Sequence, residues 1–328
     1  MRILLFAFAL LATITRGWWC TGHMIIAEIA RHNLDDGVES SLNQVILKLK
    51  EDGTFSKCTS FIPCACWSDD LKSDGLTAMA GWHFINMPYD PSSFAVNPPA
   101  VIQHDNVAQN INTLEETAKK RGINYWEMEF AIANIIHFIG DVHQPLHATE
   151  LYSQHFPHGD HGGNEFPVYY QDKQWRLHFI WDSVCGVWQN SPDRPPSQST
   201  LNWLSEMALE FQTNYSYLFN ESQKHVFNGT VMAEESFDYA VRYAYAGLQP
   251  GDNITQAYID RCWTAAGQRI TLAGYRLASE LNYVFGNGGK TRNMTELSQR
   301  YHRAHAEYHH HYASLEKRHA DAGLQRLL

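Results

Sequence analysis

The sequence predicts a mainly α-helical protein, folded as a single multi-helix domain with one small β-hairpin. Two observations support this fold class. Apolar residues recur at helical spacing in several segments between residues 23 and 285, whereas only residues 165–178 alternate in the manner of paired strands. Hydrophobic residues make up 44% of the 328-residue chain and aromatic residues 13%, which is enough for a real core and argues against disorder.

The helices are expected in a definite order along the chain. Residues 126–142 are apolar nearly all round, which is typical of a buried helix, and Pro145 follows as its end. Residues 23–34 and 38–50 have apolar positions at amphipathic spacing. The remaining expected helices span residues 105–120, 199–213, 234–247 and 255–285.

The hairpin and the C-terminal segment complete this outline. Residues 165–178 carry Asp172-Lys173 at the position of a turn between two strands. A glycine-rich break at residues 286–289 then ends the helical pattern, so we expect one domain over residues 18–286. Residues 287–328 are polar and rich in histidine, and we interpret them as a solvated helical tail. A weak metal site remains an alternative role for three of its histidines, His302, His305 and His309.

The first 17 residues have the pattern of a secretory signal peptide. Arg2 provides a basic start, residues 3–14 an apolar stretch, and Thr15 and Gly17 the small residues before a cleavage site. The apolar stretch is too short to span a membrane, and no later run of about 20 apolar residues follows. We therefore expect a secreted protein without a membrane span.

Cysteines and glycosylation sequons fit the same compartment. The chain has 6 cysteines, an even number that permits disulfides in one of 15 connectivities, and we leave the pairing open. A zinc site at Cys64-Ala-Cys66 is the alternative, but this spacing is not the usual CxxC, so we favour disulfides. N-x-S/T sequons predict glycosylation at Asn214, Asn220, Asn228, Asn253 and Asn293.

The net charge of the chain is −10, and removal of Arg2 and Arg16 with the signal peptide would lower it to −12. This balance argues against broad, sequence-independent binding of duplex nucleic acid, which depends on a basic surface. A polyanionic substrate would need local cations, such as bound metal ions, to offset the negative field.

Two histidine–aspartate pairs have the same spacing, His137-Phe-Ile-Gly-Asp141 and His178-Phe-Ile-Trp-Asp182. Residues four apart lie on one face of a helix, so each pair points an imidazole and a carboxylate in the same direction. Nitrogen and oxygen ligands of this kind suit Zn²⁺. Asp141 lies at the end of the apolar helix, where an unpaired carboxylate would be very costly to bury. A bound metal would remove that cost.

Other histidines near these pairs are assigned from their positions. Pro145 can turn the chain so that His147 returns towards Asp141, whereas His143 would point away from it on a continued helix. We expect His147 to be a ligand and His143 not to be. A solvated loop is the favoured place for His155, His158 and His161.

The order of several short motifs resembles that of the secreted class I zinc-dependent, single-strand-specific nucleases, to which zinc phospholipase C is distantly related. The resemblance runs from Trp18 to about Phe285. Its most specific part is the run from His137 to His147. The motifs are Trp18-x-x-x-Gly-His23, Trp67-x-Asp69, Trp82-His83-Phe84, His137-Phe-Ile-Gly-Asp141-x-His-Gln-Pro-Leu-His147, Gly162-Gly163-Asn164 and Leu177-His178-x-x-Trp-Asp182.

The resemblance implies a phospholipase C/nuclease-like fold and a cluster of three zinc ions. One zinc would be held by Asp69, His83, His137 and Asp141. A second would share Asp141 and take His23 with the backbone amine and carbonyl of Trp18. The third would be held by His147, His178 and Asp182. Trp18 would then be the first residue of the mature chain, which fits a cut after Gly17.

The resemblance also implies an activity. The zinc cluster would activate a water molecule oriented by Asp69 and stabilise the departing 3′ oxygen, giving 5′-phosphate products. Lys72 is at the position where the family has a basic residue near the phosphate; a solvated lysine is its alternative role. Phe84 would stack on a nucleobase. Better-known relatives often have Asp where this chain has Asn86, which leaves base recognition possible with an altered preference.

The expected function is hydrolysis of single-stranded DNA and RNA, together with a 3′-nucleotidase activity on 3′-mononucleotides, by a monomer. A zinc phospholipase C is one alternative, but Asp182 stands where that enzyme usually has Glu, and Phe84 offers a platform for a base. A non-catalytic secreted zinc-binding protein is a second alternative. It would need no ordered carboxylates beside tryptophans.

Overall fold

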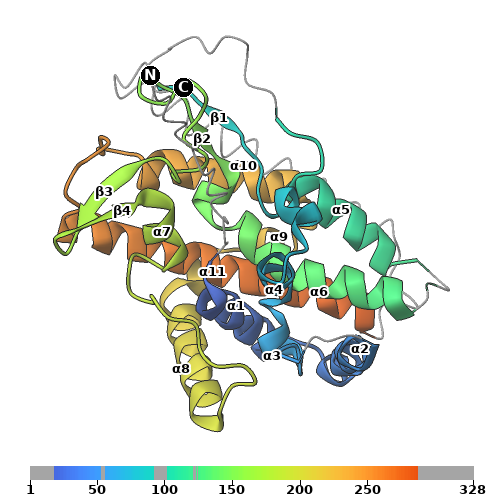
Figure 1. Ribbon diagram of the computed structural model, residues 1–328. Helices are drawn as coiled ribbons and strands as arrows, with labels where there is room; N and C mark the ends of the chain where they lie inside the picture. The colour runs from blue at the N-terminus through green and yellow to red at the C-terminus, as the bar shows by residue number, and fades with distance from the viewer. Residues whose placement is uncertain (1–17, 53–55, 92–101, 121–122, 124, 287–328) are drawn as a thin grey trace, which may run out of the picture.

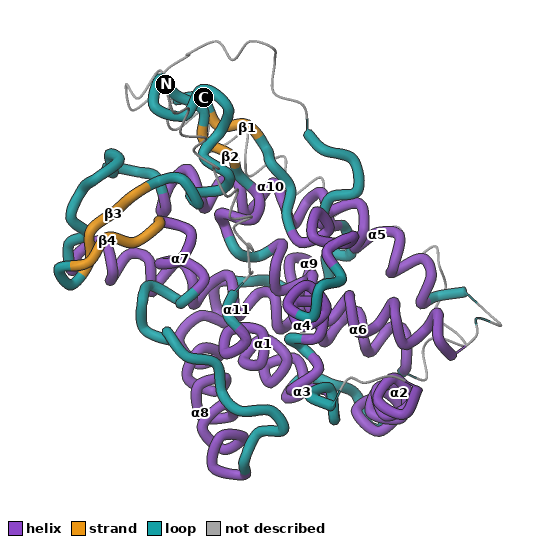
Figure 2. The backbone as a smooth tube through the Cα atoms, in the orientation of Figure 1, coloured by secondary structure: helices purple, strands orange, loops and turns teal. Residues whose placement is uncertain are grey.

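A computed structural model of the protein describes residues 18–52, 56–91, 102–120, 123 and 125–286. The expected signal peptide at residues 1–17 and the expected tail at residues 287–328 lie outside these described residues. The predicted fold class is confirmed: the described chain is mainly helical, with two small two-stranded sheets (Figure 2).

Three helices form the centre of the molecule. The longest, α11 (Gln256–Phe285), crosses the structure, and both α1 (Cys20–His32) and α6 (Tyr125–Val142) pack against it (Figure 1). The apolar residues of α6 from Ala131 onward are buried, as its sequence predicts, whereas Trp126 near its start is 62% exposed. This burial fixes the end of α6 that carries the first histidine–aspartate pair.

Outer helices surround this centre. α2 (Val38–Asp52) packs on α6 and α11, α5 (Val107–Ala118) on α6, and α8 (Gln198–Tyr215) on α1 and α11. Shorter helical turns connect the long helices and carry several of the candidate ligands. They are α3 (Phe61–Cys64), α4 (Trp67–Ser73), η1 (Thr77–His83), η2 (Pro145–Ala148), α7 (Leu177–Asp182), η3 (Ser216–Leu218) and α9 (Glu221–Lys224).

The helix expected at residues 234–247 begins earlier and changes form. α10 (Gly229–Tyr239) is followed directly by a π-helical turn, η4 (Ala240–Ala244). The early start has a local cause, because the side chain of Asn228 accepts a hydrogen bond from the backbone N–H of Val231 (3.0 Å). A capping asparagine of this kind satisfies one of the N–H groups that a helix start leaves without a partner.

The predicted hairpin is present, but its turn lies one residue earlier than expected. β3 (Pro167–Tyr170) pairs antiparallel with β4 (Lys173–Arg176), and Lys173 is the first residue of the second strand. The turn consists of Gln171 and Asp172, whose φ angles are 52° and 59°. Two positive φ angles match the twist of a two-residue hairpin turn, which explains this register.

A second sheet was not predicted. β1 (Pro88–Tyr89) and β2 (Glu150–Leu151) form a parallel pair of two residues each, too short for any sequence pattern to indicate. This pair nevertheless joins two segments far apart in the chain. It brings the residues that follow His83 alongside those that follow His147.

The cysteines form three disulfides, which resolves the pairing that the sequence left open: Cys20–Cys66, Cys58–Cys64 and Cys185–Cys262. Because Cys64 and Cys66 are both oxidised, the alternative of a zinc site at these residues is wrong. Among the described residues, no helix is long and apolar enough to cross a membrane.

The sequon asparagines differ in exposure. Asn214, Asn220 and Asn253 are exposed, Asn228 is half-buried, and Asn293 lies outside the described residues. Glycosylation at these residues stays a prediction.

Candidate metal centre

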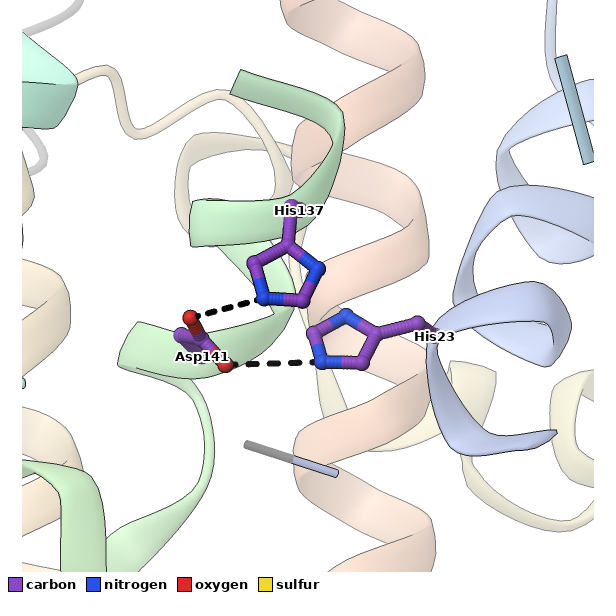
Figure 3. Close-up of side chains that lie close together, drawn as sticks. All are labelled: His23, His137 and Asp141. Carbon is purple, nitrogen blue, oxygen red and sulfur yellow. Dashed lines mark ion pairs between the residues drawn. The ribbon is translucent and has the colours of Figure 1, made fainter. Parts of the chain in front are cut away.

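Five predicted ligands from four elements converge at the end of α6. His137 and Asp141 lie one turn apart on α6, His23 comes from α1, Asp69 from α4 and His83 from η1. All five side chains are buried. Figure 3 shows His23 facing His137 and Asp141, and the two imidazole rings stack with their centroids 4.0 Å apart.

Asp141 is the centre of this group. One of its oxygens, Oδ2, is 2.8 Å from His83 Nδ1 and 3.1 Å from His137 Nε2. The other, Oδ1, is 3.4 Å from His23 Nε2. Asp69 Oδ1 completes the group at 3.6 Å from His137 Nε2. The carboxylate of Asp141 therefore faces histidines on both of its oxygens, which suits an aspartate that two metal ions share.

The second histidine–aspartate pair belongs to a separate group. His178 and Asp182 lie on α7, and His147 reaches them from η2 after the turn at Pro145. His178 Nε2 is 3.2 Å from Asp182 Oδ2, and His147 Nε2 is 3.9 Å from Asp182 Oδ1. All three side chains are buried. The structure thus brings together each predicted histidine and aspartate ligand, in three overlapping or adjacent groups able to hold a metal ion.

Backbone carbonyls orient three of the histidine rings. His137 Nδ1 lies 2.7 Å from Ala65 O, His147 Nδ1 2.7 Å from His83 O, and His178 Nδ1 2.6 Å from Gly162 O. A carbonyl only accepts, so each Nδ1 carries the proton. The opposite Nε2 atom is then the one that faces the carboxylates. Such an arrangement is usual for metal-binding histidines, since it sets both the tautomer and the ring angle.

Gly162 meets a backbone requirement at this site. Its φ angle is 61°, and a Cβ atom there would lie within 2.4 Å of Leu146 O. A side chain at this position would therefore shift the backbone of Gly162, whose own carbonyl oxygen orients His178. This explains a glycine at the first position of the Gly162-Gly163-Asn164 motif.

The surroundings set the charge of each group. Burial would raise the pKa of Asp141, but His137 and His83 hold it well below the ordinary value. Burial lowers the pKa of His83 and of His147 to about 4 each. Burial also lowers the pKa of His137, but Asp141 and Asp69 outweigh this effect and raise it to about 10. A metal ion bound at His137 would therefore displace a proton.

A cation fits this group better than the protein atoms alone do. Both ring nitrogens of His23 are buried and hydrogen-bond to nothing in the described part of the chain. Ligands about 2.0–2.1 Å from one tetrahedral ion lie about 3.3 Å apart, which is near the 2.8–3.6 Å between the atoms around Asp141 and His137. A bound metal would give His23 a direct bond in place of its long 3.4 Å contact with Asp141 and would neutralise two buried carboxylates.

Lys72 lies beside the metal centre. Its side chain is buried, and Nζ is 2.7 Å from Asp69 Oδ1. The alternative of a solvated lysine is therefore wrong. Phe84 and Asn86 are half-buried and directly follow His83, so they lie at the edge of the same group.

The beginning of the described chain is also held at this centre. Trp18 is completely buried, and the N–H of Trp19 donates to the backbone oxygen of Asp182 (2.8 Å). The Cys20–Cys66 disulfide ties the same segment to the start of α4, which carries Asp69. Metal ligation by the Trp18 backbone stays a prediction.

The histidines excluded as ligands lie elsewhere. His143 is buried, donates from Nδ1 to Ile139 O (2.7 Å) and accepts from Arg276 at Nε2 (3.0 Å). His155, His158 and His161 are exposed, as expected for a loop. Sequence reasoning missed Gln144, whose Nε2 donates to Asp182 Oδ1 (2.6 Å). A neutral amide in a His-Gln-Pro run carries no signal of this role.

Comparison with known proteins agrees with this site. The S1/P1 nuclease family model matches residues 18–286. The chain belongs to the S1/P1 nuclease family. It is 25% identical over 288 residues to Endonuclease 2 of Arabidopsis thaliana, an alignment that covers 82% of this chain and 91% of the relative. It is 27% identical over 186 residues to Nuclease S1 of Aspergillus oryzae, covering 53% of this chain and 56% of the relative.

Membership in this family decides the general activity. S1/P1 nucleases are secreted, metal-dependent enzymes, and this chain is therefore a hydrolase of phosphodiester bonds with nucleic acid as its substrate class. The buried histidine–aspartate groups around Asp141 and Asp182 are its candidate metal sites.

Proposed function

We propose that this protein is a secreted zinc-dependent endonuclease that hydrolyses single-stranded DNA and RNA to 5′-phosphate products and also removes phosphate from 3′-mononucleotides. The observation that supports it most is the convergence of buried imidazole nitrogens and carboxylate oxygens around Asp141 and Asp182. This mixed nitrogen and oxygen set favours zinc over magnesium or calcium, which prefer oxygen ligands alone.

The proposed ligands divide into three sets. Asp69, His83, His137 and Asp141 would hold one zinc ion; Trp18, His23 and Asp141 a second; and His147, His178 and Asp182 a third. When bound, zinc lowers the pKa of a water molecule and offsets negative charge on phosphoryl oxygens. The chain has 25 basic and 35 acidic residues, so its own side chains provide no net positive charge for this purpose.

Asp69 and Lys72 act together in the proposed reaction. Burial would raise the pKa of Asp69, but Lys72 and His137 hold it well below the ordinary value, so this carboxylate is ionised at neutral pH. An ionised carboxylate accepts a hydrogen bond and can orient the attacking water. The ammonium group of Lys72, 2.7 Å from Asp69, can donate to a phosphoryl oxygen and oppose its charge.

Phe84 and Asn86 would bind a nucleobase. An aromatic ring stacks on any base, and such stacking contributes about 1–3 kcal/mol per base. A base can stack in this way only after it has left a duplex, which would favour single strands. The Asn86 amide can both donate to and accept from a base edge.

The deciding experiment uses the mature chain that begins at Trp18. We expect zinc-dependent hydrolysis of single-stranded DNA at least about tenfold faster than hydrolysis of duplex DNA, together with release of phosphate from 3′-AMP. Chelation should abolish both activities, and added zinc should restore them. His137→Ala is the control that removes a ligand, and equal rates on the two forms of DNA would contradict the single-strand preference.

The phospholipase alternative is tested with the same preparation. We expect no hydrolysis of phosphatidylcholine under conditions where single-stranded DNA is degraded. Tight binding of three zinc ions without turnover of DNA, RNA or 3′-AMP would instead indicate a non-catalytic zinc-binding protein.

A further inference from the structure

We infer that Gln103 is a positioning residue that holds the segment from Phe84 to Asn86 in the conformation needed to bind a nucleobase. This inference rests on the proposed function, because it deepens the role of these two residues. Gln103 lies outside the metal centre, and its side chain hydrogen-bonds to the backbone of the segment.

The segment must be extended for its two side chains to act together. The backbone of Phe84 is extended, with φ −147° and ψ 169°. Successive side chains of an extended chain point to opposite faces, so Phe84 and Asn86 share one face and Ile85 points to the other. Ile85 is 7% exposed and packs into the core, which leaves the face of Phe84 and Asn86 for a ligand.

One edge of this segment is bound to the residues that follow α6. The N–H of Ile85 donates to His147 O (2.7 Å), and the N–H of Glu150 donates to Met87 O (2.9 Å). His147 Nδ1 also donates to His83 O. This edge therefore links the segment to His83 and His147, which are both proposed metal ligands.

Gln103 occupies the opposite edge. Its Oε1 accepts a hydrogen bond from the N–H of Asn86 (3.1 Å), and its Nε2 donates to the carbonyl of Phe84 (3.2 Å). One side-chain amide therefore makes the two hydrogen bonds that the backbone of a neighbouring strand would make. The pair of bonds holds the backbone of residues 84–86 in place and fixes the direction of their shared face.

Gln103 is itself anchored to the start of α5. Its carbonyl accepts from Asn106 Nδ2 (2.9 Å), and Asn106 Oδ1 caps the helix by accepting from the N–H of Gln109 (3.0 Å). The N–H of Val107, at the first turn of the helix, adds a hydrogen bond to Phe84 O (3.1 Å). The base-binding face is thus supported from α5, and the metal ligands are supported from the other edge.

The test compares two inhibitors of single-stranded DNA hydrolysis in the zinc-loaded enzyme, 5′-AMP and inorganic phosphate. Gln103→Met keeps the length of the side chain and removes both hydrogen bonds. We expect the inhibition constant of 5′-AMP to rise about tenfold, while that of phosphate, which has no base, and the zinc content change by less than about twofold. Gln109→Met is the matched control, since it removes a side-chain hydrogen bond to the N–H of Asp105 (3.0 Å) in the same region.

A second variant keeps the inference testable if Gln103→Met folds poorly. Gln103→Glu retains the acceptor for the N–H of Asn86 but sets a carboxylate oxygen against Phe84 O in place of the donor, so we expect the inhibition constant of 5′-AMP to rise again. An unchanged constant for 5′-AMP, or an equal rise for phosphate, would overturn the role of Gln103 and leave the proposed function intact. Failure of the wild-type enzyme to hydrolyse single-stranded DNA would overturn the proposed function itself.

Discussion

Asp141 and Asp182 each follow a histidine by four residues, yet their surroundings differ. Asp141 faces histidines on both oxygens, and these neighbours hold its pKa well below the ordinary value. Asp182 contacts His178 more closely than His147, and one of its oxygens accepts from the neutral amide of Gln144. Burial raises the pKa of Asp182 to about 6, and His178 only partly opposes it.

The difference shows that the His-x-x-x-Asp spacing alone does not determine the pKa of its aspartate. α6 is a long helix whose end lies against three other elements, so several histidines reach Asp141. α7 has 6 residues, and fewer ligands surround its aspartate. The two copies of one spacing therefore have different proposed roles, a shared ligand at Asp141 and a single-ion ligand at Asp182.

The largest expected effect comes from the two aspartates themselves. Asp141→Asn should lower the zinc content by two ions per chain and reduce activity on single-stranded DNA by well over about a hundredfold, because loss of even an outer partner of a ligand costs about 10–100-fold. Asp182→Asn should lower the content by one ion. Metal analysis of both variants after dialysis measures the difference, and equal losses would remove the distinction between the two groups.

The mature N-terminus should affect only the group around Asp141. One extra residue before Trp18 would convert the α-amine into an amide, which cannot bind zinc as a free amine does. We expect such a protein to be nearly inactive and to lack one zinc ion, with the site at Asp182 still filled. Full activity with three zinc ions would show that the Trp18 amine is not a ligand.

Gln144 provides a weaker test of the other group. Gln144→Met would remove the hydrogen bond to Asp182 Oδ1 and a second bond, from the N–H of Leu146 to Gln144 Oε1. We expect the affinity for one zinc ion to fall about 10–100-fold while the other two stay bound. Zinc titration of the metal-free protein measures this. A loss of all three ions would mean that the two groups are not independent.

The residue pattern itself predicts Asp141 as a ligand, whereas His23, Asp69 and His83 were predicted only from the resemblance to the nuclease family. Asp141 ends an apolar helix, so the residue pattern by itself indicates that this carboxylate needs partners. The long helices and the hairpin were likewise predicted from periodicity, although the N-cap of α10 and the turn of the hairpin shifted their limits.

Other features depend on contacts between distant segments, which no local pattern contains. The disulfide partners Cys20 and Cys66 are 46 residues apart, and their pairing follows from the packing of α1 against α3, which ends just before Cys66. Gln103 and Gln144 are neutral amides whose partners lie elsewhere in the chain, so neither residue type nor spacing indicates their roles.

The smallest expected effect concerns Glu280, a buried carboxyl group that lies near Glu115 and not among histidines as Asp141 does. Glu280 on α11 is buried near Glu115 on α5, and Lys119 forms an ion pair with Glu115. Burial, reinforced by Glu115, raises the pKa of Glu280 to about 8. If histidines keep Asp141 ionised, Glu280 should show the opposite behaviour and hold its proton at neutral pH.

The sign of the resulting pH dependence follows from this raised pKa. Between its ordinary pKa of 4.5 and about 8, the folded protein keeps a proton on Glu280 that the unfolded chain has lost, so stability falls as the pH rises through this range. Glu280→Gln should remove part of that fall and raise the midpoint of thermal unfolding at pH 8.5 by about 2–4 °C, with little change near pH 5. Exposed Glu116 on α5 provides the control variant, Glu116→Gln. A midpoint that changes equally at both pH values would mean that Glu280 is ionised in the folded protein, and burial alone would then not separate it from Asp141.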